Sequence, residues 1–219
     1  MNFPIMAAAA PRMTQDERSA LTRSKLAKAA FEAIRDGGYG GLRTALVAKA
    51  AGVSQGGQLH HYATKDELAL AAVQYGYERA ERQTRDNLQR FAARDEPIRA
   101  LIDDCMQFYF SGAFEVAIDV VKASPPEPRR AIGDLSRTFR DFAERGWLDI
   151  LVTCGWSVGD GHDVIDLTTS LVRGFAIRQW IQRDTGQYHR LLERWVQIVY
   201  AGCPPALQRE RQRIGAPAR

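Results

Sequence analysis

The chain has 219 residues, an apolar content of 45% and a formal net charge of +4. This length and composition are those of a globular protein with one large or two small domains. No apolar run approaches the roughly 18 residues of a membrane span, and the three cysteines are too far apart to suggest a disulfide framework or a CxxC metal site. We therefore expect a protein of the reducing cytoplasm that does not enter a membrane.

The positive charge is concentrated near the N-terminus. Residues 12–65 contain nine Lys or Arg and four Asp or Glu, a net +5, so that the whole-chain charge of +4 leaves about −1 for residues 66–219. Such an excess is expected in a part that meets a polyanion, although a solvated basic surface has the same composition.

The first residues, 1–13, lack the basic start of a signal peptide and are expected to be a disordered extension. From residue 14 onward, apolar residues recur at helical spacing and strand signals are nearly absent, which predicts an all-α protein. Thr14 and Glu17 form a capping-box pattern for the first helix, which Gly37-Gly38 should end.

Three further helices are predicted in the next stretch. A short helix should run from about 43 to 50, and a second short helix, capped by Ser54, should end near Tyr62. Thr64 to Glu67 is another capping box and opens a long helix towards Phe91.

The helical pattern restarts at Pro97, which suits a first helical turn because proline has no amide to lose. The proline-rich stretch 123–130 is expected to be a loop, followed by helices at about 129–153, 163–184 and 188–202. The tail 204–219 is expected to be exposed. These signals divide the chain into a three-helix domain at 14–64 and a larger helical domain at 65–203.

Two short helices joined by a glycine-containing turn have the arrangement that lays a recognition helix in the DNA major groove. Gly52 permits a turn conformation that a side chain disfavours. On the second helix, Gln55 can donate to and accept from a base edge, and Gly57 would keep the backbone close to the groove. His61 and Lys65 can reach phosphates.

The stretch "LVAKAAGVSQGGQLHHYATKDEL" at residues 46–68 resembles the signature of the tetracycline-repressor (TetR) family. The resemblance is strongest over residues 18–68, and it implies a helix-turn-helix DNA-binding domain followed by a helical domain that binds an effector and forms a dimer. The residues expected to contact DNA are Arg43, Thr44, Ser54, Gln55, Gly57, Leu59, His60, His61 and Lys65.

Three departures from the family pattern involve four positions. Gln58 and Leu59 stand where a Leu or Phe and then a Tyr are usual, so either Leu59 takes over the core contact or Gln58 lies inward and bonds to the backbone. Arg43 replaces the usual Ser or Thr cap before the second helix, and Ala63 stands where a Pro is common. These departures concern the details of base reading.

Other readings of the same residues are weaker. His60 and His61 project about 100° apart on a helix, so they cannot both bind one metal ion, and the Gly56-Gly57 pair lacks the spacing of a phosphate loop. The remaining candidate catalytic groups are isolated. We therefore expect no enzyme, no metal and no cofactor.

The resemblance implies a pocket for a small, largely apolar effector between the helices of the second domain. Aromatic side chains are abundant from about 97 to 156, although most of them could equally be ordinary core. The residues expected to line the pocket are Cys105, Phe108, Tyr109, Phe142 and Trp147.

The last two predicted helices are apolar on more than one face, so each needs a second partner besides its own domain. The resemblance implies that this second partner is the same pair of helices in another subunit. The residues expected at this dimer interface are Leu167, Leu171, Phe175, Leu192, Trp195 and Val199.

Together these expectations describe a homodimeric transcriptional regulator, and by the resemblance a repressor, that binds a palindromic DNA operator and is released by its effector. The alternative is an all-helical ligand-binding or adaptor protein without sequence-specific DNA binding, for which the exchanged Gln58 and Leu59 are the best argument.

Overall fold

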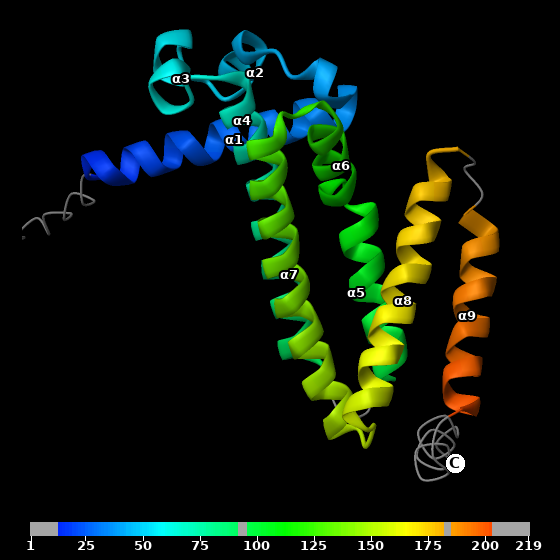
Figure 1. The fold of residues 1–219 in the computed structure, drawn as a ribbon. Coiled ribbons are helices and arrows are strands. Elements are labelled where there is room, and N and C mark those ends of the chain that lie inside the picture. The colour runs from blue at the N-terminus through cyan, green and yellow to red at the C-terminus, as the bar shows by residue number, and fades with distance from the viewer. Residues whose placement is uncertain (1–12, 92–95, 182–184, 203–219) are drawn as a thin grey trace, which may run out of the picture.

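The computed structural model describes residues 13–91, 96–181 and 185–202, and within these ranges it contains nine α-helices and no β-strand (Figure 1). The all-α prediction is confirmed. The extension before Met13, the tail 204–219 and Cys203 lie outside the described residues. The helices are α1 Gln15–Gly41, α2 Thr44–Ala50, α3 Gln55–His61, α4 Lys65–Arg90, α5 Pro97–Phe110, α6 Ala113–Ala123, α7 Pro126–Thr153, α8 Val158–Gln179 and α9 Thr185–Ala201.

The predicted capping residues start their helices. The Thr14 hydroxyl accepts a hydrogen bond from the Glu17 amide, and the Glu17 carboxylate accepts one from the Thr14 amide. At α4, the Thr64 hydroxyl accepts from the Glu67 amide at 3.1 Å, whereas the Glu67 carboxylate accepts from the amide of Ala63 at 2.8 Å. Both arrangements satisfy amides that have no partner inside the helix.

Several boundaries differ from the sequence-based prediction, and the residues at three of them show why. The loop predicted over 123–130 is wrong from Pro126 onward, because Pro126 and Pro128 lie in the first turn of α7, where missing amides cost no helical hydrogen bond. Gly112, with a φ of 89°, separates α5 from α6, which were expected as one segment. Helix α8 begins at Val158, before the predicted start at about 163, because Ser157 caps it.

Two clusters of buried apolar residues hold the helices together. The first joins α1, α2, α4, α6 and the first half of α7, so α1 and α2 share a core with part of the larger bundle. The second joins α5, α8, α9 and the second half of α7. Helices α4 and α7 run side by side (Figure 1), and α7 contributes to both clusters.

None of the described helices is long and apolar enough to cross a membrane. Burial raises the pKa of the Cys105 thiol to about 12.

Candidate nucleic-acid interface and ligand cavity

The turn between α2 and α3 has the geometry that the sequence predicted. Gly52 adopts a φ of 68°, which a side chain would strain. The Val53 amide then donates to the Ala48 carbonyl at 2.9 Å, and Val47 and Ala48 are buried beneath the turn. This contact fixes α3 relative to α2 and leaves one face of α3 open.

The outer face of α3 carries Gln55, Gly56, Leu59 and His60, all of which are exposed. On the opposite side, Gln58 is only 1% exposed. The spacing of three or four residues between the exposed positions places them on one side of the helix. Four exposed positions in register on a helix held by its neighbours form a surface that can enter a groove.

The exchange of Gln58 and Leu59 left two possibilities: Leu59 makes the core contact, or Gln58 lies inward and bonds to the backbone. The Gln58 amide nitrogen donates to the Tyr62 carbonyl at 2.7 Å, so Gln58 lies inward and bonds to the backbone at the end of α3. Its carbonyl oxygen is buried without a hydrogen-bond partner. The exchange has therefore turned the apolar side chain, Leu59, outward.

The two glycines of α3 have different surroundings. A Cβ on Gly57 would lie 3.0 Å from Val53 Cγ1 and 3.2 Å from the Ser54 hydroxyl, so its lack of a side chain serves the packing of the turn. A Cβ on Gly56 would meet nothing within 4 Å. Gly56, which the sequence reading did not single out, is the glycine on the outer face.

The other predicted DNA contacts surround this face. Arg43 precedes α2, is exposed and makes no side-chain capping bond, and the neighbouring Thr44 begins the helix and is half-buried. The Ser54 hydroxyl accepts from the Gly57 amide at 3.1 Å, so this side chain caps α3. Arg43 is therefore the more available of these groups for a phosphate.

Basic groups flank the C-terminal end of α3. The Arg23 guanidinium lies 5.3 Å from the centre of the Tyr62 ring. Burial, His60 and Arg23 lower the pKa of the half-buried His61. Lys65 Nζ sits 4.1 Å from the centre of the Tyr39 ring, a cation–π contact that positions the ammonium group at the start of α4. Arg23 lies far away in sequence, and only packing of α1 against the end of α3 reveals it.

A cavity of about 130 Å³ lies among α4, α5, α6, α7 and α8. Its lining contains four of the predicted effector residues, Cys105, Phe108, Tyr109 and Trp147. Further rings that sequence reasoning did not assign to it are those of Tyr77, Phe114 and Phe139. Rings in this group pack closely, with centroids of Phe108 and Phe139 4.6 Å apart and those of Tyr109 and Phe114 5.0 Å apart.

Phe142 lies apart from the cavity. The Arg85 guanidinium stands 4.8 Å from the centre of its ring, on the side of α7 that meets α4. Phe139, one turn earlier, takes the lining position because it faces Tyr77 and Phe108.

One wall of the cavity is a buried carboxylate, Asp104 of α5. It accepts hydrogen bonds from the Thr84 hydroxyl at 3.0 Å, the Asn87 amide at 2.6 Å and the Trp147 indole at 2.8 Å. Burial raises the pKa of Asp104, and the three donors partly offset that effect. The network ties α4, through Thr84 and Asn87, to the lining of the cavity.

The last two helices each have an inner and an outer apolar face. Phe175, Leu192 and Val199, three of the predicted interface residues, are buried inside the protomer, where Phe175 stacks on Tyr188. Leu167 is 55% exposed, and Leu171 and Trp195 are half-buried. Exposed apolar residues that the prediction missed are Ile181 and Ile198, at 85% and 50% exposure.

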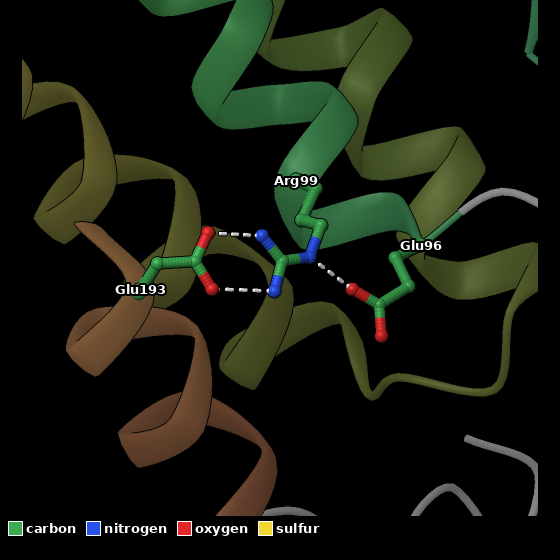
Figure 2. Close-up of polar contacts among 3 residues, drawn as sticks. All are labelled: Glu96, Arg99 and Glu193. Atoms are coloured by element: carbon green, nitrogen blue, oxygen red, sulfur yellow. Dashed lines mark hydrogen bonds and ion pairs between the residues drawn. The ribbon is translucent and has the colours of Figure 1, made fainter. Parts of the chain in front are cut away.

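Helix α9 is joined to α5 by an ion pair (Figure 2). The guanidinium of Arg99 donates to both carboxylate oxygens of Glu193, with 2.6 Å between Nη2 and Oε2, and also to Glu96. These bonds raise the pKa of Arg99 above its usual value. The bidentate geometry fixes the orientation of α9 as well as its position.

Among the described residues, no three His, Cys, Asp or Glu side chains lie close enough together to hold a metal ion. The His162 ring bonds to the Glu144 carboxylate at 2.7 Å. The fold and its open helix instead define a helix-turn-helix protein with a cavity in its helical bundle.

Comparison with known proteins agrees with that class. Residues 26–72 match the family model described as bacterial regulatory proteins, tetR family. The HTH-type transcriptional regulator CymR of Pseudomonas putida is 35% identical over 190 residues, which cover 86% of this chain and 94% of that regulator.

Solved structures share the fold. A transcriptional regulator from Rhodococcus sp. RHA1 has a TM-score of 0.64 at 20% identity, covering 82% of this chain and 96% of its own. FadR of Bacillus subtilis, in complex with stearoyl-CoA, has a TM-score of 0.55 at 14% identity, covering 82% of this chain and 98% of its own.

The chain belongs to the TetR family of transcriptional regulators. It is thus a DNA-binding, helix-turn-helix protein, and its family membership confirms the expectation that it is not an enzyme.

Proposed function

We propose that this protein is a repressor that binds a palindromic operator as a homodimer and leaves the DNA when a small, largely apolar effector binds in the cavity. Residues 14–64 would read DNA, and residues from 65 onward would bind the effector and form the dimer. The observation that carries this proposal is that one helix, α4, joins the two sites.

Helix α4 begins at Lys65, and only three residues separate it from His61, where α3 ends. Further along the same helix, Tyr77 borders the cavity and Thr84 bonds to Asp104 in the cavity wall. An effector that displaces these residues would displace α4 and with it the recognition helix. The effector acts only if it binds the conformation that does not fit DNA more tightly than the one that does.

The exposed face of α3 would enter the major groove. Gln55 has the groups to pair with an adenine edge, and Arg43, Arg23 and Lys65 stand around the face where phosphates would pass. The phosphate contacts would give affinity and the base contacts would give sequence preference.

The first experiment is selection of binding sites from random duplex DNA with the purified protein, followed by mobility shifts at two salt concentrations. A selected palindrome would support a specific dimeric regulator. Binding without sequence preference would favour the alternative, a ligand-binding protein that does not read sequence.

Two substitutions test the residue roles on that operator. Lys65→Ala should weaken binding to every DNA and reduce the slope of log affinity against log salt by about one unit. Gln55→Ala should mainly relax the preference at one base pair. Equal effects of both changes on selected and random DNA would contradict these roles.

The dimer would form through the outer faces of α8 and α9. Leu167 on α8, Ile181 just after the end of α8 and Ile198 on α9 are exposed apolar side chains. The two helices lie at one edge of the molecule (Figure 1). Large apolar side chains gathered on two neighbouring helices suit an isologous four-helix interface.

Ile198→Asp should convert the dimer to monomers, since a carboxylate in an apolar interface loses its hydration. Sedimentation velocity measures the change. The matched control is Leu21→Asp, at a residue of α1 that is 45% exposed. Helix α1 lies away from α9 (Figure 1). A dimer that survives Ile198→Asp would place the interface elsewhere.

A further inference from the structure

Leu59 is a large apolar side chain on the outer face of the recognition helix, and it is 51% exposed. Its neighbour Gln58 is buried and bonds to the Tyr62 carbonyl. The polar side chain of this pair is therefore inside and the apolar side chain is outside, the reverse of the usual arrangement. An exposed leucine on a surface that contacts a partner gains free energy when the partner covers it.

The surroundings of Leu59 leave room for that partner. Gln55 is one turn earlier on the same face, and Gly56 beside it has no side chain, with nothing within 4 Å of the place where a Cβ would lie. A base edge can therefore approach Leu59 closely from the direction in which Gln55 would read the groove.

The major groove offers one apolar group to such a side chain, the C5-methyl group of thymine. Leucine neither donates nor accepts a hydrogen bond, so it cannot distinguish the other base edges by polar contacts. We propose that Leu59 is a specificity-determining residue that reads the methyl group of a thymine in each half of the operator. This inference rests on the proposed function.

The helix geometry also gives the position of this thymine. Gln55 and Leu59 are four residues apart, which is about 6 Å along the axis of α3. Successive base pairs are about 3.4 Å apart. The thymine should therefore lie one or two base pairs from the pair whose preference Gln55→Ala relaxes.

Replacement of thymine by deoxyuridine removes this methyl group and leaves the hydrogen-bonding edge unchanged. Each thymine of the selected operator is replaced in turn, symmetrically in both half-sites, and the affinity of the wild-type protein is measured by fluorescence anisotropy. We expect one position to weaken binding about fourfold per half-site, the effect of one methyl group no longer buried.

Two variants assign the effect to its side chain. Leu59→Ala should bind thymine and deoxyuridine operators equally well, whereas Gln55→Ala should keep the discrimination. Both positions are exposed, and circular dichroism verifies that the variants remain folded.

Two results would overturn the inference. The first is that no thymine within two base pairs of the pair read by Gln55 is sensitive to loss of its methyl group. The second is that Leu59→Ala still distinguishes thymine from deoxyuridine. Neither result would contradict the proposed function as a regulator. If the protein selected no DNA sequence at all, the proposed function would be contradicted, and the role of Leu59 would be contradicted as well.

Discussion

The two hydrophobic clusters of this protein are built from different residues. Alanine is the commonest buried residue of the first, which joins the DNA-binding helices to α4 and α6, whereas no alanine is among the described buried residues of the second. In the first, helices approach so closely that a Cβ on Gly76 would lie 2.9 Å from the Phe31 ring. The second is filled by branched side chains and rings such as Trp156 and Tyr188.

The cavity lies where the two clusters meet. Tyr77 and Phe139 belong to the first cluster, and Leu101, Trp147 and Ile165 to the second, and all five line the cavity. Small residues in close contact leave little freedom for adjustment, so the first cluster should move as one body. Large side chains around a void can repack when it is filled. This difference in packing suits a cavity ligand that would shift the first cluster as a unit relative to the second.

The same substitution inside the first cluster and at the cavity on its edge gives the largest expected contrast. Ala72→Leu, at a residue of α4 that is fully buried in the first cluster, should lower the free energy of unfolding by about 2–3 kcal/mol, because nothing can make room for the added atoms. Ala143→Leu, on the cavity lining, should cost less than about 1 kcal/mol. Urea unfolding measures both.

Ala143→Leu should also fill part of the cavity, so effector binding should be lost while DNA binding remains. If the two leucine variants were equally destabilised, the contrast in packing would be an incorrect description of the molecule.

Buried polar groups that bond to Trp147 and Trp195, or to their partners, provide the next test. Thr84→Val keeps the shape of the side chain and removes its hydrogen bond to the Asp104 carboxylate, so it should cost about 1.5–3 kcal/mol. Thr168→Val is the control, since the fully buried Thr168 accepts only from the neutral indole of Trp195, and it should cost about 1 kcal/mol. The reverse order would mean that the charge of Asp104 adds nothing to the network.

The pH dependence of stability separates Asp104 from other carboxylates. Because burial raises its pKa in the folded protein, the stability that Asp104 contributes is fully present below its unfolded pKa and is lost as the pH rises through the raised value. The free energy of unfolding of the wild type minus that of Asp104→Asn should therefore fall as the pH rises from about 4. A difference that stays constant with pH would refute the raised pKa.

The smallest effect is expected at the ion pair that holds α9. Glu193→Gln removes the charge opposite Arg99, but both side chains are partly exposed, so the loss should be about 0.5–1 kcal/mol and should shrink in high salt. Thermal unfolding at low and high salt measures it. A larger loss that salt does not change would show that Glu193 acts through packing.

The DNA-binding helices were predictable because their signals are local. Ser54, Thr64 and Gly52 each fix a helix start or a turn through contacts with residues at most a few positions away. The inward position of Gln58 was only one of two possibilities, because it depends on the Tyr62 carbonyl at the end of the helix.

In the second domain, the sequence did not predict which face is buried where a helix is apolar on two sides. Phe139 and Phe142 are one turn apart on α7, yet one lines the cavity and the other meets Arg85. On α8, periodicity showed two apolar faces, but only the packing of α9 decides that Phe175 lies inside and Leu167 outside. Which face is inner depends on contacts between distant segments, and a single sequence does not contain that choice.

The indole of Trp147 gives the molecule an optical signal of its own. Its N–H points at the buried Asp104 carboxylate while its ring borders the cavity. Because indole emission responds to nearby charge and to water, a compound that enters the cavity should change the colour or intensity of this fluorescence. Candidate effectors can thus be screened against the protein by itself, before any operator is known.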